Sequence, residues 1–160
     1  GQDEAETKRA AAANMSVRWL DRVASDELPA VVAGHDVCLG IFSTGGKALR
    51  VVPNKVFQGA AAGCAIITSD TSPQRRAFGD AALLVPPGDA TALADALRRL
   101  ADGREELARL RNDANQLARA RFTPEQVVGA LTDRLVGIAR DDQRPVVRDE
   151  RAQPGCEHQA

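Results

Sequence analysis

The sequence predicts an α/β fold, in which helices cover both faces of a doubly wound parallel sheet. Three short apolar runs, residues 37–42, 65–68 and 81–85, alternate with segments of helical pattern. This alternation is typical of βαβ units, and continuous apolar runs are typical of strands buried on both faces. Beyond residue 89 the pattern is helical alone. We therefore expect a Rossmann-like sheet followed by C-terminal helices in one domain over residues 1–140.

The N-terminal elements are expected to lie outside the sheet centre. Residues 3–14 are rich in Ala and carry acids at their start, which predicts a surface helix. The apolar residues 17–20 predict a short outer strand. Ser25 and Asp26 stand where they could cap a helix that holds Leu28.

The central stretch, residues 37–69, reads as strand, loop, helix and strand. Asn54 stands where an N-cap belongs, the helix is expected over residues 55–62, and Gly63 suits the position that follows a helix. Parallel strands bind ligands at their carboxyl ends, and the loop of residues 43–55 follows the first strand at such an end. This loop is therefore the first candidate site.

The C-terminal part carries clear helix signals. Ser72-Pro73 predicts a cap with proline at the first helical position, and Asp89 predicts the cap of the next helix. Residues 123–126 form a capping box. Apolar faces are expected on three helices, with these members: Leu93, Leu97, Leu100; Leu107, Leu110, Ala114, Leu117; Val127, Val128, Leu131, Leu135, Ile138. Residues 141–160 are polar and aperiodic, which predicts a disordered tail.

Composition excludes several classes of function. The net charge of −1 argues against a general nucleic-acid binder. No apolar run approaches the roughly 20 residues that span a bilayer, and no basic amphipathic helix indicates membrane association, so we expect a cytoplasmic protein. The three cysteines, Cys38, Cys64 and Cys156, have no metal-ligand spacing and are expected to be reduced thiols. We find no metal site, nucleophile triad or P-loop.

The loop of residues 43–55 points to an anion. No Asp or Glu occurs in residues 37–69, although the chain contains 22 acids. Lys47, Arg50 and Lys55 lie in this stretch, and a lysine in the first turn of a helix opposes the helix dipole unless an anion is bound there. From the residues alone two interpretations stay open: a phosphate cradle, and a solvated basic loop before an ordinary helix.

Several motifs resemble the C-terminal half of family 4, GT-B-fold glycosyltransferases. They are RVVPNKVFQGAAAGCAIITSD, then ALLVPPGDATALADALRRL, and upstream the segment DELP followed by AGHDVCLGIF. In that family a donor loop leads to a helix, an apolar strand ending in Ser-Asp, and a Pro-Pro-Gly-Asp turn. The resemblance keeps this order over residues 17–135. It implies a Rossmann-like, nucleotide-sugar-binding half of a GT-B enzyme.

The resemblance also assigns site residues. The family's signature is a pair of glutamates eight positions apart, and the matching positions hold Arg50 and Gln58 here. Gln58 can still hydrogen-bond a ribose, whereas Arg50 suits a phosphate or an acidic sugar. The Pro53-Asn54-Lys55 variant resembles a subset of the family. We expect the donor diphosphate to be bound by Arg50, Asn54 and Lys55 with the backbone of Gly45 and Gly46.

The resemblance implies hexosyl transfer from a nucleoside-diphosphate sugar, with that donor as substrate and no further cofactor or tightly bound metal. It also implies an N-terminal acceptor domain, or a separate subunit that supplies one. The chain opens at Gly1-Gln2-Asp3 without Met, so we expect a sheet incomplete at its N-terminus and a chain inactive alone. Because both glutamates are replaced, a non-catalytic nucleotide-binding or interaction subunit of the same fold is the alternative. A purely structural domain is the third hypothesis.

Overall fold

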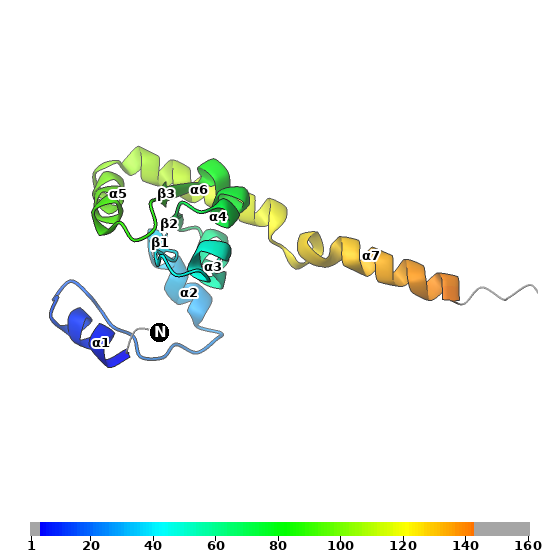
Figure 1. Cartoon of the computed structure of the whole chain (residues 1–160), viewed down its shortest axis with the longest axis horizontal. Coiled ribbons are helices and arrows are strands. Elements are labelled where there is room, and N and C mark those ends of the chain that lie inside the picture. The colour runs from blue at the N-terminus through cyan, green and yellow to red at the C-terminus, as the bar shows by residue number, and fades with distance from the viewer. Residues whose placement is uncertain (1–3, 143–160) are drawn as a thin grey trace, which may run out of the picture. The chain divides into compact units, whose positions relative to one another are not determined.

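The computed structural model describes residues 4–142 (Figure 1). The chain divides into two compact units, Gly1–Phe122 and Thr123–Ala160. The first unit holds a sheet and its covering helices. The second contains the helix α7 (Pro124–Asp142).

A three-stranded parallel sheet lies at the centre of the first unit. Its strands are β1 (Val37–Leu39), β2 (Ala65–Ser69) and β3 (Ala82–Val85), in the order β1-β2-β3. Val37 lies opposite Ala65, and Ile66 lies opposite Ala82. Every residue of β2 is buried, as its continuous apolar run predicted. The predicted parallel sheet is confirmed, although β1 ends at Leu39 rather than at residue 42.

Helices cover both faces of this sheet, which confirms the doubly wound arrangement. One core cluster joins α3, α4 and the C-terminal half of α6 to one face of the sheet, with Val56, Ile66, Phe78 and Ala114 among its buried members. The other joins α5 and the N-terminal half of α6 to the opposite face, with Ile67, Leu100 and Leu110 among its members. The helices are α2 (Leu28–Ala33), α3 (Asn54–Ala61), α4 (Ser72–Phe78), α5 (Ala90–Asp102) and α6 (Arg104–Arg121).

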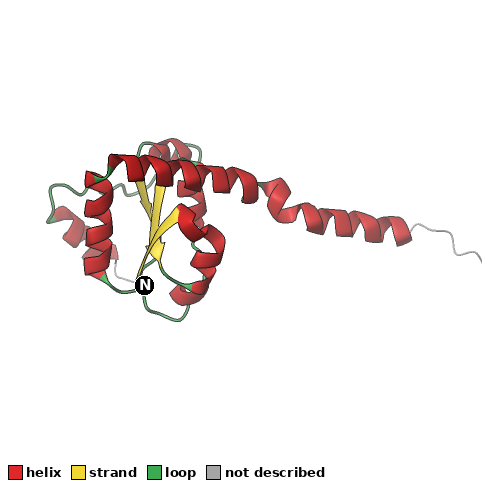
Figure 2. Cartoon of the chain, turned by 90° about the horizontal axis from the view of Figure 1, so that it is seen from above, coloured by secondary structure: helices red, strands yellow, loops and turns green. Residues whose placement is uncertain are grey.

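The helix α6 crosses the sheet where its strands begin. Arg111 donates from Nη1 to the Asp36 carboxylate at 2.6 Å and from Nε to the Gly63 carbonyl at 2.8 Å. Asp36 directly precedes β1 and Gly63 lies two residues before β2, so both contacts stand at the amino ends of the strands. Figure 2 shows this long helix crossing one end of the strands. The opposite, carboxyl ends are therefore free for a loop and a ligand.

The predicted strand at residues 17–20 is wrong. The helix α1 (Glu4–Ala12) forms as expected, but residues 17–20 are irregular. Val17 and Trp19 are 48% and 41% exposed, and the Trp19 indole donates to Asp21. A strand needs a neighbour for its backbone hydrogen bonds, and no strand among residues 4–142 pairs with this segment.

Helix ends agree with the sequence at some positions and differ at others. The Asp89 carboxylate accepts from Ala92 N–H, and Gly63 adopts a φ of +82° after α3, both as predicted. Asn54 is the first helical residue rather than the cap, because the extended Pro53 occupies the cap position. The residue before α2 is Glu27, not the expected Ser25 or Asp26. The residue before α4 is Thr71, not the expected Ser72. None of these three residues donates or accepts through its side chain as a cap, so helix starts here depend on tertiary packing.

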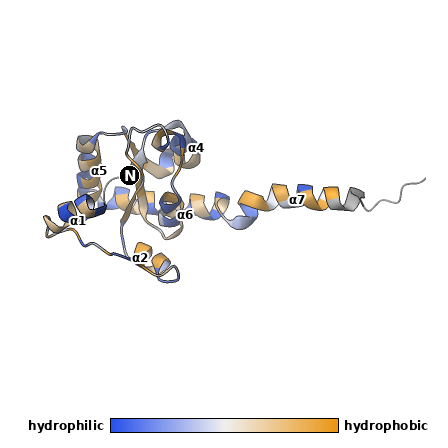
Figure 3. Ribbon diagram, turned by 60° about the horizontal axis from the view of Figure 1, so that its bottom comes forward, coloured by the Kyte–Doolittle hydropathy of each residue, from blue (hydrophilic) through white to orange (hydrophobic). Residues whose placement is uncertain are grey.

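The second unit begins with the predicted cap. Gln126 N–H donates to Thr123 Oγ1 at 3.4 Å, and α7 (Pro124–Asp142) follows. Its expected apolar residues are exposed, and Figure 3 shows apolar and polar positions alternating along this helix. The predicted disordered tail, residues 141–160, overlaps α7 at Asp141 and Asp142. Its remainder lies outside the described residues.

Candidate functional site

The segment between β1 and α3 lies against the carboxyl ends of the other two strands. Gly40 N–H donates to the Ile67 carbonyl of β2 at 2.8 Å, and a Cβ on Gly40 would lie 2.0 Å from Thr68 Oγ1. Further along, the Phe42 carbonyl accepts from Gly88 N–H at 2.6 Å, just past β3. The loop therefore lies at the sheet edge where ligands of parallel α/β folds bind.

A buried polar network joins the carboxyl end of β2 to α4. Gln74 of α4 is fully buried, and its Nε2 donates to Ser69 Oγ at 2.9 Å. The Thr68 hydroxyl donates to Oε1 of the Gln74 side-chain amide. Because a buried amide must be satisfied, these bonds fix the end of β2 to α4. Nothing in the sequence marks Gln74, because a lone polar residue in a short helix gives no signal of burial.

Positive charge in the loop has no neutralising partner within residues 4–142. Lys47, Arg50 and Lys55 are exposed, and none of them forms an ion pair with a described residue. The acids that bound this stretch in sequence are already engaged: Asp36 pairs with Arg111, and Asp70 pairs with Arg75. No described carboxylate therefore neutralises the charge of Lys47, Arg50 or Lys55.

The loop holds Arg50 against its own backbone. Arg50 closes the short 3-10 helix η1 (Ala48–Arg50), and its Nε donates to the Gly46 carbonyl at 2.7 Å. Leu49 N–H donates to the Gly45 carbonyl, while Gly45 N–H donates to Ser43 Oγ at 3.2 Å. The structure thus brings Arg50 and Gly46 together. The Gly45 N–H, which was expected to bind a phosphate, is therefore already hydrogen-bonded within the loop.

The first turns of α3 carry the other predicted residues. Asn54, Lys55 and Gln58 are all exposed, and Lys55 and Gln58 are three positions apart, so they share one face of the helix. No side-chain hydrogen bond joins them to another residue in the described part of the chain. These side chains are therefore available to a ligand at the helix start.

The two described thiols serve packing. Burial raises the pKa of Cys38, although the Lys55 ammonium acts in the opposite direction, and the Cys38 thiol donates to the Lys55 carbonyl at 3.3 Å. Burial is also the main cause that raises the pKa of Cys64, with the nearby Cys38 second. Both thiols remain protonated near neutral pH and are free, in agreement with the expectation of reduced thiols.

Two pockets of the first unit lie away from the loop cations. A pocket of about 430 Å³ is lined mainly by apolar side chains at the start of β1, including Val37, Leu97 and Leu100. Another of about 210 Å³ is lined by Val31, Cys38 and Cys64 among others. Neither pocket is lined by any of the three loop cations.

The fold and the loop define a Rossmann-like α/β domain with a basic carboxyl edge. A model of the family described as "Glycosyl transferases group 1" matches residues 1–103. The chain therefore belongs to the group 1 glycosyl transferases. No curated protein matches the chain.

A solved structure shares the fold. Sucrose-phosphate synthase from Thermosynechococcus elongatus superposes with a TM-score of 0.61 at 21% sequence identity. The match covers 88% of this chain and 36% of the synthase, so the chain spans about a third of the length of that protein. The predicted identity, a Rossmann-like half of a GT-B glycosyltransferase, is confirmed.

No helix within residues 4–142 is both long and apolar enough to cross a membrane. Over the same residues, no three or more His, Cys, Asp or Glu side chains are grouped as metal ligands.

Proposed function

We propose that this chain binds the nucleoside diphosphate of a sugar donor at the loop between β1 and α3. One observation carries the proposal: an acid-free segment at the carboxyl end of β1 holds three cations without described ion-pair partners. In a group 1 glycosyl transferase, such a surface suits the anionic part of the donor.

Each predicted residue has a role in this proposal. Lys55 and the start of α3 bind the diphosphate, because the ammonium, the free N–H groups and the helix dipole all favour negative charge there. Asn54, Arg50 and the Gly46 N–H contribute the remaining polar contacts to the diphosphate, and the Gly45 N–H can join them only by leaving Ser43 Oγ. Gln58 hydrogen-bonds the ribose hydroxyls. As the glycosidic bond to the donor breaks, negative charge grows on the departing diphosphate, and the same cations stabilise it.

Hexosyl transfer also needs an acceptor site. The chain spans only 36% of the length of the synthase that it resembles. We propose that an acceptor-binding domain, in the same protein or in a separate subunit, faces the carboxyl edge. Residues 1–140 then serve as the donor-binding part, which has no turnover by itself.

Calorimetric titration of the 160-residue chain with UDP and with GDP tests the proposal. We expect micromolar binding of at least one nucleotide. A Lys55→Ala variant should weaken it by about 1–3 kcal/mol, the size of a hydrogen bond between charged groups. Lys8→Ala is the matched control, because Lys8 of α1 is already paired with Glu4 and Asp21. A folded chain that binds neither nucleotide contradicts the proposal.

The alternative is a nucleotide-binding or interaction subunit without catalysis. Arg50 and Gln58 favour it, because they place no carboxylate where the family resemblance implies a glutamate pair. Both hypotheses predict nucleotide binding. They differ once the acceptor domain is added, since only the enzyme then hydrolyses or transfers the donor sugar.

A further inference from the structure

One nitrogen of the Arg50 guanidinium, Nε, is hydrogen-bonded within the loop, and the two terminal nitrogens have no described acceptor. Its Nε donates to the Gly46 carbonyl at 2.7 Å, and its Nη2 lies 3.2 Å from where a Cβ on Gly46 would stand. The group therefore lies along the loop, where glycine leaves room for it. No described residue accepts from Nη1 or Nη2, so both terminal nitrogens can donate in parallel to one carboxylate or phosphate.

The charge at this edge exceeds what a diphosphate requires. In a sugar nucleotide each of the two phosphates carries one negative charge, and the helix dipole of α3 already favours part of it. Lys47, Arg50 and Lys55 are three cations with no described acid to pair with. A donor with a third negative charge would complement these three cations. The planar guanidinium of Arg50, with two parallel N–H donors, suits a planar carboxylate better than a lysine ammonium does.

We infer that the site selects a donor whose sugar carries a carboxylate, a nucleoside-diphosphate uronate, and that Arg50 is the residue that recognises it. This inference rests on the proposed function. Lys55 and the start of α3 bind the diphosphate, and this inference moves Arg50 from the diphosphate to the sugar. The free Nη1 and Nη2 of Arg50 bind the two oxygens of the sugar carboxylate. Arg50 thus determines specificity.

Competition calorimetry on the full chain tests the inference with UDP-glucuronate, UDP-glucose and UDP. The guanosine pair GDP-mannuronate and GDP-mannose runs in parallel, so that no base is presumed. We expect the uronate to bind at least about tenfold more tightly than the neutral sugar nucleotide, as one added charge-assisted contact implies. This preference should weaken with added salt.

Two variants assign the preference to Arg50. Arg50→Gln should bring the ratio of the affinities for the uronate and the neutral sugar nucleotide close to one. Arg50→Lys keeps the charge but not the pair of terminal N–H donors, and it should give an intermediate ratio. Lys47→Gln is the matched control, because it removes a charge from the same loop and leaves the Arg50 guanidinium unchanged. That variant should keep the preference.

The outcomes separate this inference from the proposed function. Equal affinity for UDP-glucuronate and UDP-glucose overturns the inference and leaves donor binding intact. So does UDP that binds as tightly as the uronate, since Arg50 then takes the terminal phosphate. A loss of preference in Lys47→Gln equal to that in Arg50→Gln also overturns it, because bulk charge would be the cause. Failure of every nucleotide to bind overturns both proposals.

Discussion

Single glycines decide how closely α3 approaches the sheet. A Cβ on Gly59 would lie 2.5 Å from Cys38 Cβ and 3.2 Å from Ile66 Cδ1, so only glycine lets the helix rest on β1 and β2. Gly40 has the same role in the loop, where a Cβ would meet Thr68. These close approaches set the position of α3, and with it the position of Lys55 and Gln58.

The substitution Gly59→Ala tests this contact. The added methyl should lower the free energy of unfolding by about 1–3 kcal/mol, as for other overpacked cores, despite the better helix propensity of alanine. Urea unfolding followed by circular dichroism measures the change. Gly129→Ala in α7, where a Cβ meets nothing within 4 Å, is the control and should not lower stability. Equal effects at both positions would contradict the packing argument.

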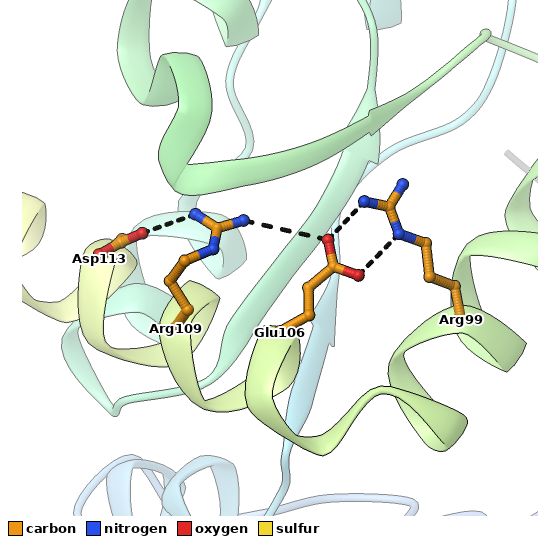
Figure 4. A network of polar contacts seen from close by, with 4 residues as sticks. All are labelled: Arg99, Glu106, Arg109 and Asp113. Carbon is orange, nitrogen blue, oxygen red and sulfur yellow. Dashed lines mark hydrogen bonds and ion pairs between the residues drawn. The ribbon is translucent and has the colours of Figure 1, made fainter.

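At the level of elements, an ion-pair network joins α5 to α6 (Figure 4). Arg99 donates to both oxygens of Glu106, at 2.7 Å from Nε and 2.5 Å from Nη2, across the break at Gly103. Arg109 lies between Glu106 and Asp113, with its Nη1 2.9 Å from the Asp113 carboxylate. The network fixes the angle between two helices that cover the same face of the sheet.

The network makes stability depend on pH. The hydrogen bond from Arg99 holds the pKa of Glu106 below its ordinary value of 4.5. A carboxylate with a lowered folded-state pKa stabilises the protein above its unfolded-state pKa, and this contribution is lost as the pH falls through the folded-state pKa. In urea unfolding, Glu106→Gln should therefore be less stable than the parent near pH 7, with the difference shrinking below about pH 4.3. Glu105→Gln, without a described ion pair, should show no such trend.

At the scale of the first unit, α6 connects both cores to the amino ends of the strands. Leu107 and Leu110 pack on one face of the sheet, and Ala114 and Ala118 pack on the other. Arg111, between these pairs, bonds to Asp36 and Gly63. One helix thus aligns the starts of β1 and β2, while the carboxyl edge is left to the loop.

Arg111→Ala should destabilise the first unit more than a neighbouring surface arginine does. We expect a loss of about 1–2 kcal/mol, below the roughly 1.5–3 kcal/mol of a buried charged hydrogen bond because the side chain is partly exposed. Arg109→Ala removes surface ion pairs on the same helix and should cost about 0.5 kcal/mol or less. Thermal and urea unfolding of both variants give the comparison. A smaller loss for Arg111→Ala than for Arg109→Ala would contradict the role assigned to Arg111.

The sequence alone determined the features that depend on local chemistry. Residues 65–68 read as a buried strand because they are continuously apolar, and Gly63 and Asp89 marked helix boundaries through a positive φ and a capping carboxylate. The absence of acids from residues 37–69 placed the candidate site on the loop before α3. In each case the residues that carry the prediction lie within a few positions of the element that they specify.

Only the tertiary structure decided what depends on distant neighbours. Residues 17–20 carry an apolar run but pair with no described strand, since pairing is a property of two segments and not of one. Asn54 looks like a cap, yet the extended Pro53 takes that place. The tether of Arg50 to Gly46 and the burial of Gln74 follow from the path of the backbone through space. Local pattern therefore predicted the candidate site, and long-range packing determined which of its charges have no described partner.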